Sequence, residues 1–479
     1  MIMEYKKKLF IGNEWIDPCD NEFINTYNPA NLTKISVIPR GKSIDINFAA
    51  ESAKKALNEE WKNYTPQDRG NLLMKFANMI RENYKELGKI ESEEIGRPIN
   101  QSEDEIQSVA DCITYNAGAA DKLEGKVIPV GNNFVDFTEL KPIGVTGHIV
   151  PWNFPLGMAF RSVAPALAAG CTVVLKPDEN SSLSALALGN LICDAGFPKG
   201  VFNIVTGYGE EAGLHICENK FINHITFTGS VETGRKVYKN STNTFKTVVL
   251  ELGGKNPMII FEDADVDRAV NDAIKGAFSN SGQVCSSSSR LIIHENIFDQ
   301  FIYKFKTQVS KLKVGNPLDN PDLGPVVSES QYNKITGLLH NAVQCGAEVI
   351  CGGNSLKGSL GGYFIEPTLL NNVNKNLSIT SEEVFGPVAI AYKFKTDEDA
   401  LNLANGLDTG LVAGIFTRDL SKALLLKDEL EFGSVWINGW FIGGLQAPNG
   451  GVKNSGFGRE RGLPGLMNYV SIKNIGICK

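Results

Sequence analysis

The period of the hydrophobic pattern changes along the chain, and each change predicts a different kind of element. Over residues 10–40, short apolar runs are separated by glycine and proline, which favours strands and turns. Apolar positions then recur at helical spacing from a helix start at Thr65-Pro66 to about Leu123. Residues 125–140 alternate apolar and polar side chains, which predicts an extended arm or hairpin that stands apart.

Residues 142–252 alternate between apolar strands and helical segments. The expected strands cover residues 144–150, 172–175, 202–205, 224–227 and 247–250, and the expected helices cover 156–169, 182–195, 208–217 and 231–240. This order predicts parallel strands joined by right-handed crossovers in an open, Rossmann-like α/β sheet. Ligands of such sheets bind beyond the carboxyl ends of the strands, so we expect a crevice there.

A second alternation runs from Pro257 to about Gly450 and predicts a second α/β domain. Its expected strands cover residues 258–261, 290–294, 389–392, 411–416 and 434–438. The final segment, residues 468–476, is short and apolar. It is suited to pair with the 125–140 arm, either in the same subunit or in a neighbouring one.

Composition and charge narrow the functional classes. A chain of 479 residues has room for two or three domains with large cores. Its nine cysteines include no CxxC pair and no histidine at zinc-ligand spacing, which predicts reduced thiols in the cytoplasm and no metal site. Residues 1–8 lack the apolar core of a signal peptide, and the chain has no apolar run long enough to span a bilayer. The formal net charge of −7, with scattered basic residues, argues against nucleic acid or a membrane as partner.

One cysteine stands out because of its setting. Cys285 lies in a glycine- and serine-rich segment, residues 279–290, between an amphipathic helix and an apolar strand. Most free cysteines are small buried hydrophobes, and that is the expectation for most of the nine here. A thiol in a polar turn has little packing to do, so Cys285 is the candidate nucleophile.

Two glycine-rich segments compete for the phosphates of a dinucleotide. Residues 207–212 match the G-x-G-x-x-G/A fingerprint, and residues 229–234 also follow a strand and open a helix, where the backbone N–H groups stabilise a phosphate. We assign the pyrophosphate to the second segment and the adenine side to the first. The alternative for both is that the glycines only make tight turns.

Charged residues follow two of the predicted strands. Lys176 and Glu179 come after one of them, and an acid that accepts from a ribose 2′-hydroxyl favours NAD over NADP. Alternatively, Asp178 or Glu179 caps the next helix. Glu251 ends another apolar strand, where a carboxylate has a raised pKa and can act as a general base. The alternative is an ion pair with Lys255 or a place at a helix terminus.

Taken together and in this order, these segments resemble the aldehyde dehydrogenase superfamily. The motifs that carry the resemblance are Pro151-Trp-Asn-Phe-Pro155, Leu175-Lys-Pro177, Phe227-Thr-Gly-Ser230, Leu250-Glu-Leu-Gly-Gly-Lys255, Gly282-Gln-Val-Cys285, Glu383-Val-Phe-Gly-Pro387 and Ser455-Gly-Phe-Gly-Arg-Glu460. The resemblance runs from about Phe10 to the C-terminus. It implies an NAD-binding domain (residues 1–122 and 142–252), a catalytic domain (253–455) and an oligomerisation arm (123–141 and 462–479) of a homodimer or homotetramer.

The resemblance also implies a mechanism and a set of site residues. Cys285 would attack the aldehyde, Asn153 and the Cys285 N–H would hold the oxyanion, and Glu251 would activate the water that releases a carboxylic acid rather than a coenzyme A ester. The cofactor residues would be Ile149, Trp152, Lys176, Glu179, Gly209, Gly229, Ser230, Leu252, Glu383 and Phe385.

Two positions leave the substrate open. Arg161 and Asn449 stand where betaine aldehyde enzymes of the family often carry aromatic residues, so a cation-binding box is in doubt. Arg161 resembles the arginine of the semialdehyde and aromatic-aldehyde branches, where it would grip a carboxylate, and its alternative is a salt bridge. Phe154, Trp440 and Phe441 are expected to line the tunnel. Other classes kept in view are a betaine or amino-aldehyde dehydrogenase, a non-enzymatic crystallin-like or scaffolding protein, and a cofactor-free cysteine hydrolase.

Overall fold

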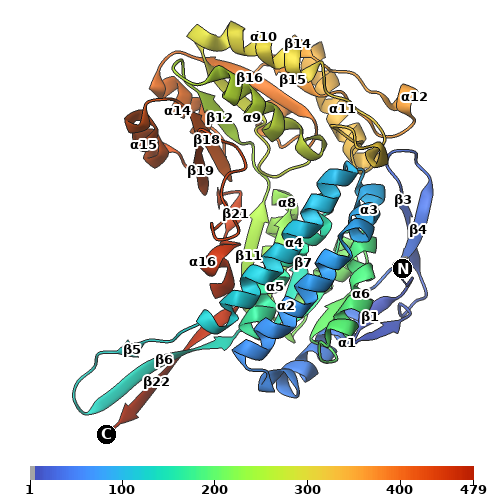
Figure 1. The fold of residues 1–479 in the computed structure, drawn as a ribbon, viewed down its shortest axis with the longest axis vertical. Coiled ribbons are helices and arrows are strands. Elements are labelled where there is room, and N and C mark those ends of the chain that lie inside the picture. The colour runs from blue at the N-terminus through green and yellow to red at the C-terminus, as the bar shows by residue number, and fades with distance from the viewer. Residues whose placement is uncertain (1–5) are drawn as a thin grey trace.

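Two β-sheets, each covered by helices, lie one above the other in the structure, a computed structural model that describes residues 6–479 (Figure 1). The first five residues belong to the segment in which no signal peptide is expected, and they lie outside this range. Within it, the larger sheet has eight strands and the next one seven. Both domains are α/β, as the alternating pattern predicts.

The larger sheet has the strand order β2-β1-β9-β8-β7-β10-β11-β21. These strands are Glu14–Ile16, Leu9–Ile11, Phe202–Ile204, Thr172–Lys176, Val145–Ile149, Ile222–Gly229, Thr247–Leu252 and Gly456–Phe457. The five strands from β9 to β11 are parallel, as predicted, whereas β1 and β21 join them antiparallel. From β7 the chain winds outward one way through β8 and β9 and the other way through β10 and β11. The carboxyl end of β7 is therefore the expected ligand crevice.

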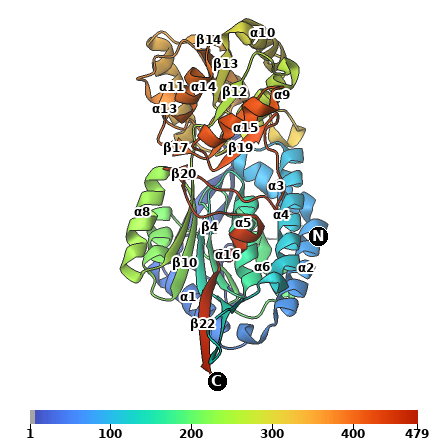
Figure 2. The same ribbon diagram turned by 90° about the vertical axis from the view of Figure 1, so that its left-hand side faces the viewer.

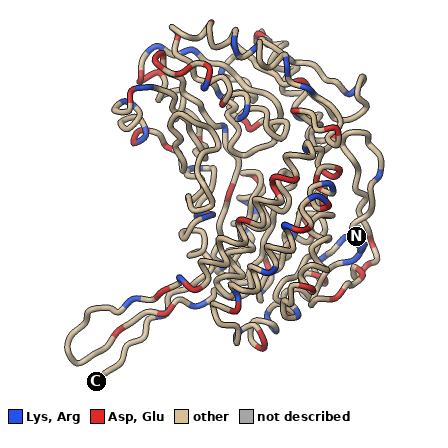
Figure 3. The backbone as a smooth tube through the Cα atoms, in the orientation of Figure 1, with Lys and Arg blue, Asp and Glu red and all other residues tan. Residues whose placement is uncertain are grey.

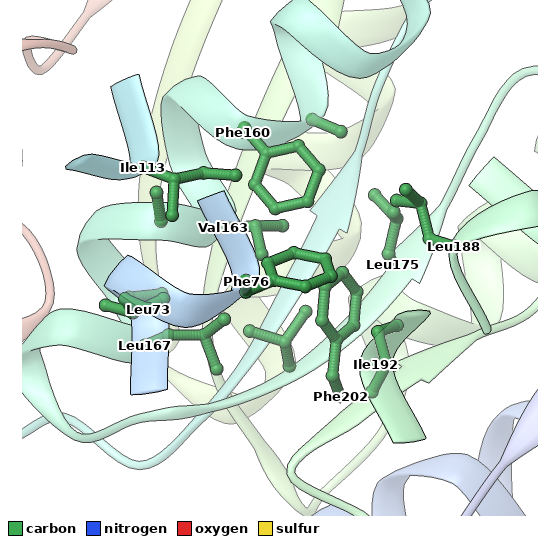
Figure 4. Packing of buried hydrophobic residues seen from close by; sticks show 14 of the residues in the cluster. Leu73, Phe76, Ile113, Phe160, Val163, Leu167, Leu175, Leu188, Ile192 and Phe202 are labelled. Atoms are coloured by element: carbon green, nitrogen blue, oxygen red, sulfur yellow. The ribbon is translucent and has the colours of Figure 1, made fainter. Parts of the chain in front are cut away.

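Helices cover both faces of this sheet. They are α1 (Ser43–Asn58), α2 (Pro66–Glu82), α3 (Tyr84–Ile95), α4 (Ile99–Ala119), α5 (Pro155–Ala169), α6 (Leu183–Ala195), α7 (Leu214–Glu218) and α8 (Val231–Ser241). Figure 2 shows α8 on one side of the sheet and α2 and α4 on the other. Buried aromatic residues join the layers: Phe76 of α2 packs against Phe160 of α5, which also contacts Phe202 of β9 (Figure 4). This packing fixes α5, which begins beside the crevice.

The second sheet has the order β14-β15-β16-β13-β12-β18-β19. Its strands are Glu348–Cys351, Thr368–Asn371, Val388–Phe394, Arg290–His294, Pro257–Ile260, Val412–Phe416 and Ser434–Ile437. Its helices include α9 (Val266–Phe278), α10 (Phe298–Val309), α11 (Glu329–Gln344), α14 (Asp397–Asn405) and α15 (Leu420–Glu429). Along β12 the side chains alternate, because Met258 and Ile260 pack in the cluster with α9 and α10, while Ile259 packs in the cluster with α14 and α15. A two-sided core of this kind gives an unbroken apolar strand.

A three-stranded arm projects from the larger domain (Figure 1). It consists of β5 (Val127–Ile128), β6 (Phe134–Pro142) and β22 (Val470–Cys478). The final strand β22 pairs antiparallel with β6 of the same chain along its whole length, which is one of the two pairings considered from the sequence. Two further pieces complete the fold: the hairpin of β3 (Phe23–Tyr27) and β4 (Lys34–Pro39), and the helix α16 (Gly462–Met467).

Acidic and basic residues are interspersed over both domains and the arm (Figure 3). This mixture agrees with the scattered basic residues of the sequence and contrasts with the clustered basic face of a nucleic-acid-binding protein. Across residues 6–479, no helix combines the length and the apolar character needed to cross a membrane.

Candidate active site

The turn that carries Cys285 is built from unusual backbone conformations. After α9 the chain enters η5 (Ser279–Gly282), where Asn280, Ser281 and Gly282 have φ values of 48°, 55° and 73°. A Cβ atom on Gly282 would lie 2.0 Å from the Gly386 carbonyl oxygen, so only glycine fits there. The chain then reaches β13, and Cys285 lies in the helix-to-strand turn that the sequence predicts.

Hydrogen bonds from distant residues hold this turn in place. The Asn256 amide donates to the carbonyl oxygens of Cys285 (2.8 Å) and Ser287 (3.0 Å). The Trp440 indole donates to the Ser286 carbonyl at 3.1 Å. The thiol itself is only partly exposed, and burial raises the pKa of Cys285 to about 11, with Arg161 acting in the opposite direction. The resting side chain is therefore a thiol.

Asn153 brings the larger domain into contact with the Cys285 turn. It follows the carboxyl end of β7 and is buried. Its Nδ2 donates to the Gln283 carbonyl at 2.9 Å, and its own carbonyl oxygen accepts from Asn280 Nδ2 at 2.9 Å. The amide group is thus positioned against the turn two residues before Cys285.

Glu251 lies at the end of β11, buried among charged side chains. Its Oε2 accepts from Asn449 Nδ2 at 3.3 Å and lies 3.9 Å from Arg161 Nη2. Arg161 Nη2 also pairs with Glu460 Oε2 at 2.5 Å. Burial, followed by the charge of Glu460, raises the pKa of Glu251 to about 8. These partners, rather than the Lys255 considered from the sequence, surround the carboxylate.

Seven of the ten predicted cofactor residues line one cavity of about 700 Å³ at the carboxyl ends of the central strands. They are Ile149, Trp152, Lys176, Glu179, Gly209, Gly229 and Ser230. Ser230 caps α8, accepting from the Thr233 N–H at 3.2 Å, so the helix N-terminus opens into the cavity. Lys176 Nζ lies 3.4 Å from Glu179 Oε2. The alternative that Asp178 or Glu179 caps the next helix is wrong, because the Leu183 N–H donates to the Glu94 carboxylate.

The other three predicted cofactor residues lie near the join of the two domains. Glu383 accepts from the Gly254 N–H at 3.2 Å, and a Cβ atom on Gly253 would lie 2.1 Å from its Oε2. Burial raises the pKa of Glu383 to about 7. Phe385, with a left-handed φ of 54°, packs edge-on against Trp152 at 5.3 Å between ring centroids. Leu252 packs in the core of the larger domain, against Gly234 of α8.

A second cavity, of about 440 Å³, is lined by Cys285 and by the four predicted substrate residues Phe154, Arg161, Phe441 and Asn449. The rest of the wall combines apolar side chains with polar and charged ones, the latter including Asp104, Glu105 and Arg461. The apolar side chains are Val109, Met158, Val284, Leu411, Trp436, Ile442 and Leu445. The prediction that Trp440 lines the tunnel is wrong, because that ring is buried under the Cys285 turn and Trp436 lines the cavity instead. Arg161 is not a free guanidinium, since its Nη2 pairs with Glu460 Oε2 and lies near Glu251 Oε2.

Sequence reasoning missed the role of Glu460 in this site. Glu460 belongs to one of the motifs quoted above, but nothing in its spacing indicates a contact with Arg161, 299 positions earlier in the chain. Among the side chains of residues 6–479, no group of three or more histidine, cysteine or acidic residues is arranged to hold a metal ion.

Comparisons with known proteins cover nearly the whole chain. Residues 15–475 match the Aldehyde dehydrogenase family. The chain is 41% identical to human Retinal dehydrogenase 2 over 473 residues, covering 98% of this chain and 91% of that protein. It is 40% identical to peroxisomal Aminoaldehyde dehydrogenase 1 of Pisum sativum, covering 98% and 95%. An NAD⁺ complex of aldehyde dehydrogenase from Bacillus cereus has 36% identity and a TM-score of 0.96, with coverage of 98% of this chain and 96% of that one.

Proposed function

Since this chain belongs to the aldehyde dehydrogenase family, we propose that it oxidises an apolar, preferably aromatic, aldehyde to the carboxylic acid with NAD. One observation carries the proposal. Asn153, Glu251 and Cys285 come from three distant parts of the chain and meet at the join of the two domains. Trp152, before Asn153, lines the 700 Å³ cavity, and Phe154, after it, lines the 440 Å³ cavity that holds the thiol.

The residues of the larger cavity fit NAD. The N-terminus of α8, with Gly229 and Ser230, suits the pyrophosphate. The carboxylate of Glu179 suits ribose hydroxyls and would repel the extra phosphate of NADP. Glu383 and Phe385, beside Trp152, would hold the nicotinamide end. When bound, NAD accepts the hydride that the aldehyde loses.

Cys285 and Asn153 would carry out the first half of the reaction. The Cys285 thiol loses its proton to water, and the thiolate adds to the aldehyde carbon to give a thiohemiacetal. Negative charge develops on the former carbonyl oxygen, where the Asn153 amide and the Cys285 N–H can donate hydrogen bonds. After the carbon has lost its hydride, a thioester remains on Cys285.

Glu251 would carry out the second half. Its carboxylate takes a proton from a water molecule, and the resulting hydroxide adds to the thioester carbon. The carbon–sulfur bond then breaks, which releases the carboxylic acid and returns the cysteine. A carboxylate held at this place is needed for hydrolysis, whereas a coenzyme A acceptor would bring its own nucleophile.

The assembly proposals rest on the arm. Exposed apolar side chains on it include Val127, Phe134 and Ile472, which are 80%, 53% and 69% exposed. Such a surface gains free energy when a second subunit covers it. We keep residues 123–141 and 462–479 as an oligomerisation arm of a homodimer or homotetramer, with residues 1–122 and 142–252 binding NAD and residues 253–455 supplying the nucleophile. A cytoplasmic location remains part of the proposal.

Benzaldehyde is expected to be a better substrate than succinic semialdehyde, with kcat/KM about 10- to 100-fold higher. Besides Arg461, the cavity wall carries the carboxyl groups of Asp104 and Glu105, and a substrate carboxylate buried there without a partner of its own costs roughly 1–3 kcal/mol. Arg161 cannot supply that partner while it is paired with Glu460. NADH absorbance after mixing with NAD and each aldehyde measures the ratio. Absence of NADH with every aldehyde would instead favour a non-enzymatic member of the family.

The Arg161→Leu variant separates the two roles considered for this residue. If Arg161 only balances Glu460 and Glu251, the variant changes the preference between the two aldehydes by less than about 3-fold, even if both rates fall. A selective collapse with succinic semialdehyde would show that Arg161 grips the substrate carboxylate.

Replacing Asn153 with alanine is expected to lower the rate of the NADH burst by about 10²- to 10³-fold, since one oxyanion donor is lost. The reaction of Cys285 with iodoacetamide develops no oxyanion and serves as the control, which should change little. A burst of unchanged rate would contradict the assignment of Asn153.

A further inference from the structure

The helix that follows Asn153 has no capping side chain of its own. Phe154 stands at the N-cap position of α5, and its side chain makes no capping hydrogen bond. The first N–H groups of the helix are taken instead by two glutamates from other helices. The Leu156 N–H donates to Glu91 of α3 at 3.0 Å, and the Gly157 N–H donates to Glu105 of α4 at 2.9 Å.

Arg97 links these two carboxylates. Its guanidinium pairs with Glu91 at 2.7 Å and with Glu105, and its Nε donates to Ser102 at 3.2 Å. Glu91, Arg97 and Glu105 are 0%, 1% and 9% exposed. Burial raises the pKa of both carboxyl groups, and Arg97 and the N-terminal dipole of α5 act in the opposite direction. Loss of the cation would leave uncompensated buried charge, so the three side chains act as a unit.

The same unit reaches the substrate cavity. The Arg97 guanidinium lies over the Phe154 ring, 4.8 Å from its centroid. Phe154, Gly157 and Glu105 line the cavity that contains Cys285. A Cβ atom on Gly157 would lie 2.4 Å from Glu105 Oε1, so the carboxylate reaches the backbone only because this residue is glycine. Asn153, the proposed oxyanion donor, directly precedes Phe154.

We infer that Glu91, Arg97 and Glu105 are positioning residues for the aldehyde: they fix the start of α5, and with it the Phe154 ring and the Asn153 amide. This role deepens the proposed function and rests on it. A cluster that only stabilised the fold would lie away from the cavity. In this cluster, Arg97 contacts the Phe154 ring, and Glu105 forms part of the cavity wall.

Three substitutions test the role from different sides: Arg97→Met removes the cation, Glu105→Gln removes one charge, and Gly157→Ala displaces the Glu105 carboxylate. Each is expected to lower kcat/KM for benzaldehyde about 10- to 100-fold, the loss that a displacement of about 1 Å causes. The KM for NAD should change less than 2-fold, since the other cavity is untouched. Arg97→Lys keeps a cation at this place and should recover most of the lost kcat/KM.

Glu94→Gln is the matched control. Glu94 is also a buried glutamate of α3 that caps another helix, through the Leu183 N–H, but it does not contact Phe154. It should lower stability without changing kcat/KM for benzaldehyde at saturating NAD. Urea unfolding of every variant identifies any that fails to fold, and Arg97→Lys and Glu105→Gln retain most of the contacts.

The outcomes separate the two proposals. A parent protein that forms no NADH with any aldehyde contradicts the proposed function. If the parent protein forms NADH but the folded variants keep kcat/KM for benzaldehyde within 2-fold of the parent value, the positioning role is overturned. Equal losses in the Glu94→Gln control would also overturn it, because they would reflect stability alone.

Discussion

Replacing Cys285 with alanine is expected to abolish aldehyde-dependent NADH formation, with a fall in turnover of at least about 10⁴-fold, because no covalent intermediate can form. Three residues that contain sulfur line the 440 Å³ cavity, namely the half-buried Cys285, Cys112 and Met158. Burial raises the pKa of Cys112 to about 11 as well, and that thiol is engaged with the Phe160 carbonyl. By contrast, the turn that carries Cys285 is the one that accepts a hydrogen bond from the Asn153 amide.

The assay follows absorbance of NADH after mixing enzyme, NAD and benzaldehyde. Cys351→Ala is the matched control, since Cys351 is a half-buried cysteine of the same domain on β14, far along the sheet. It should retain activity within a factor of about 2, as expected for a substitution away from the site. Full turnover by the Cys285 variant would remove the nucleophile assignment, and loss of activity in both variants would point to instability.

The fold was predictable where the pattern is periodic. The five central strands of the larger sheet are all close to their predicted ranges, because buried parallel strands give unbroken apolar runs between helices. Strands β14 and β15 went unpredicted: each has four residues, β14 is largely unburied at the sheet edge, and the polar Asn371 ends β15. Short strands of this kind owe their structure to pairing with a neighbour, which local sequence does not encode.

Part of the candidate site was also predictable from the sequence, and part was not. Cys285 stands out in the sequence because its polar turn is unlike a core position, and the structure gives that turn three successive left-handed residues. The contact between Arg161 and Glu460 joins positions 299 residues apart, so no local pattern indicates it. Yet this contact changes the expected substrate, because it accounts for the charge that would otherwise bind a carboxylate.

Changing Glu251 to glutamine is expected to separate the two halves of the reaction. Glutamine keeps the shape of the side chain and can still contact Asn449, but it cannot take a proton from water. Acylation of Cys285 should therefore proceed, giving a burst of one NADH per active site. Steady-state turnover should then fall by about 10²- to 10⁴-fold, the usual contribution of a general base. Stopped-flow absorbance resolves the burst from the steady state.

The pH dependence gives a second measurement of the same group. Burial and the charge of Glu460 raise the pKa of Glu251 to about 8, so this carboxyl is mostly protonated at pH 7. Because the ionised form is the base, deacylation in the parent should speed up as the pH rises from 7 to 9 and level off above that range. Glu251→Gln should lose this rise while its burst remains.

Hydroxylamine distinguishes a stalled thioester from a damaged site. It attacks an acyl group without help from a general base, so it should restore NADH turnover in Glu251→Gln while accelerating the parent much less. A variant that shows neither a burst nor rescue would place Glu251 in acylation instead. Formation of an acyl-coenzyme A by the parent would contradict hydrolysis, because the carboxylate of Glu251 would then have no water to activate.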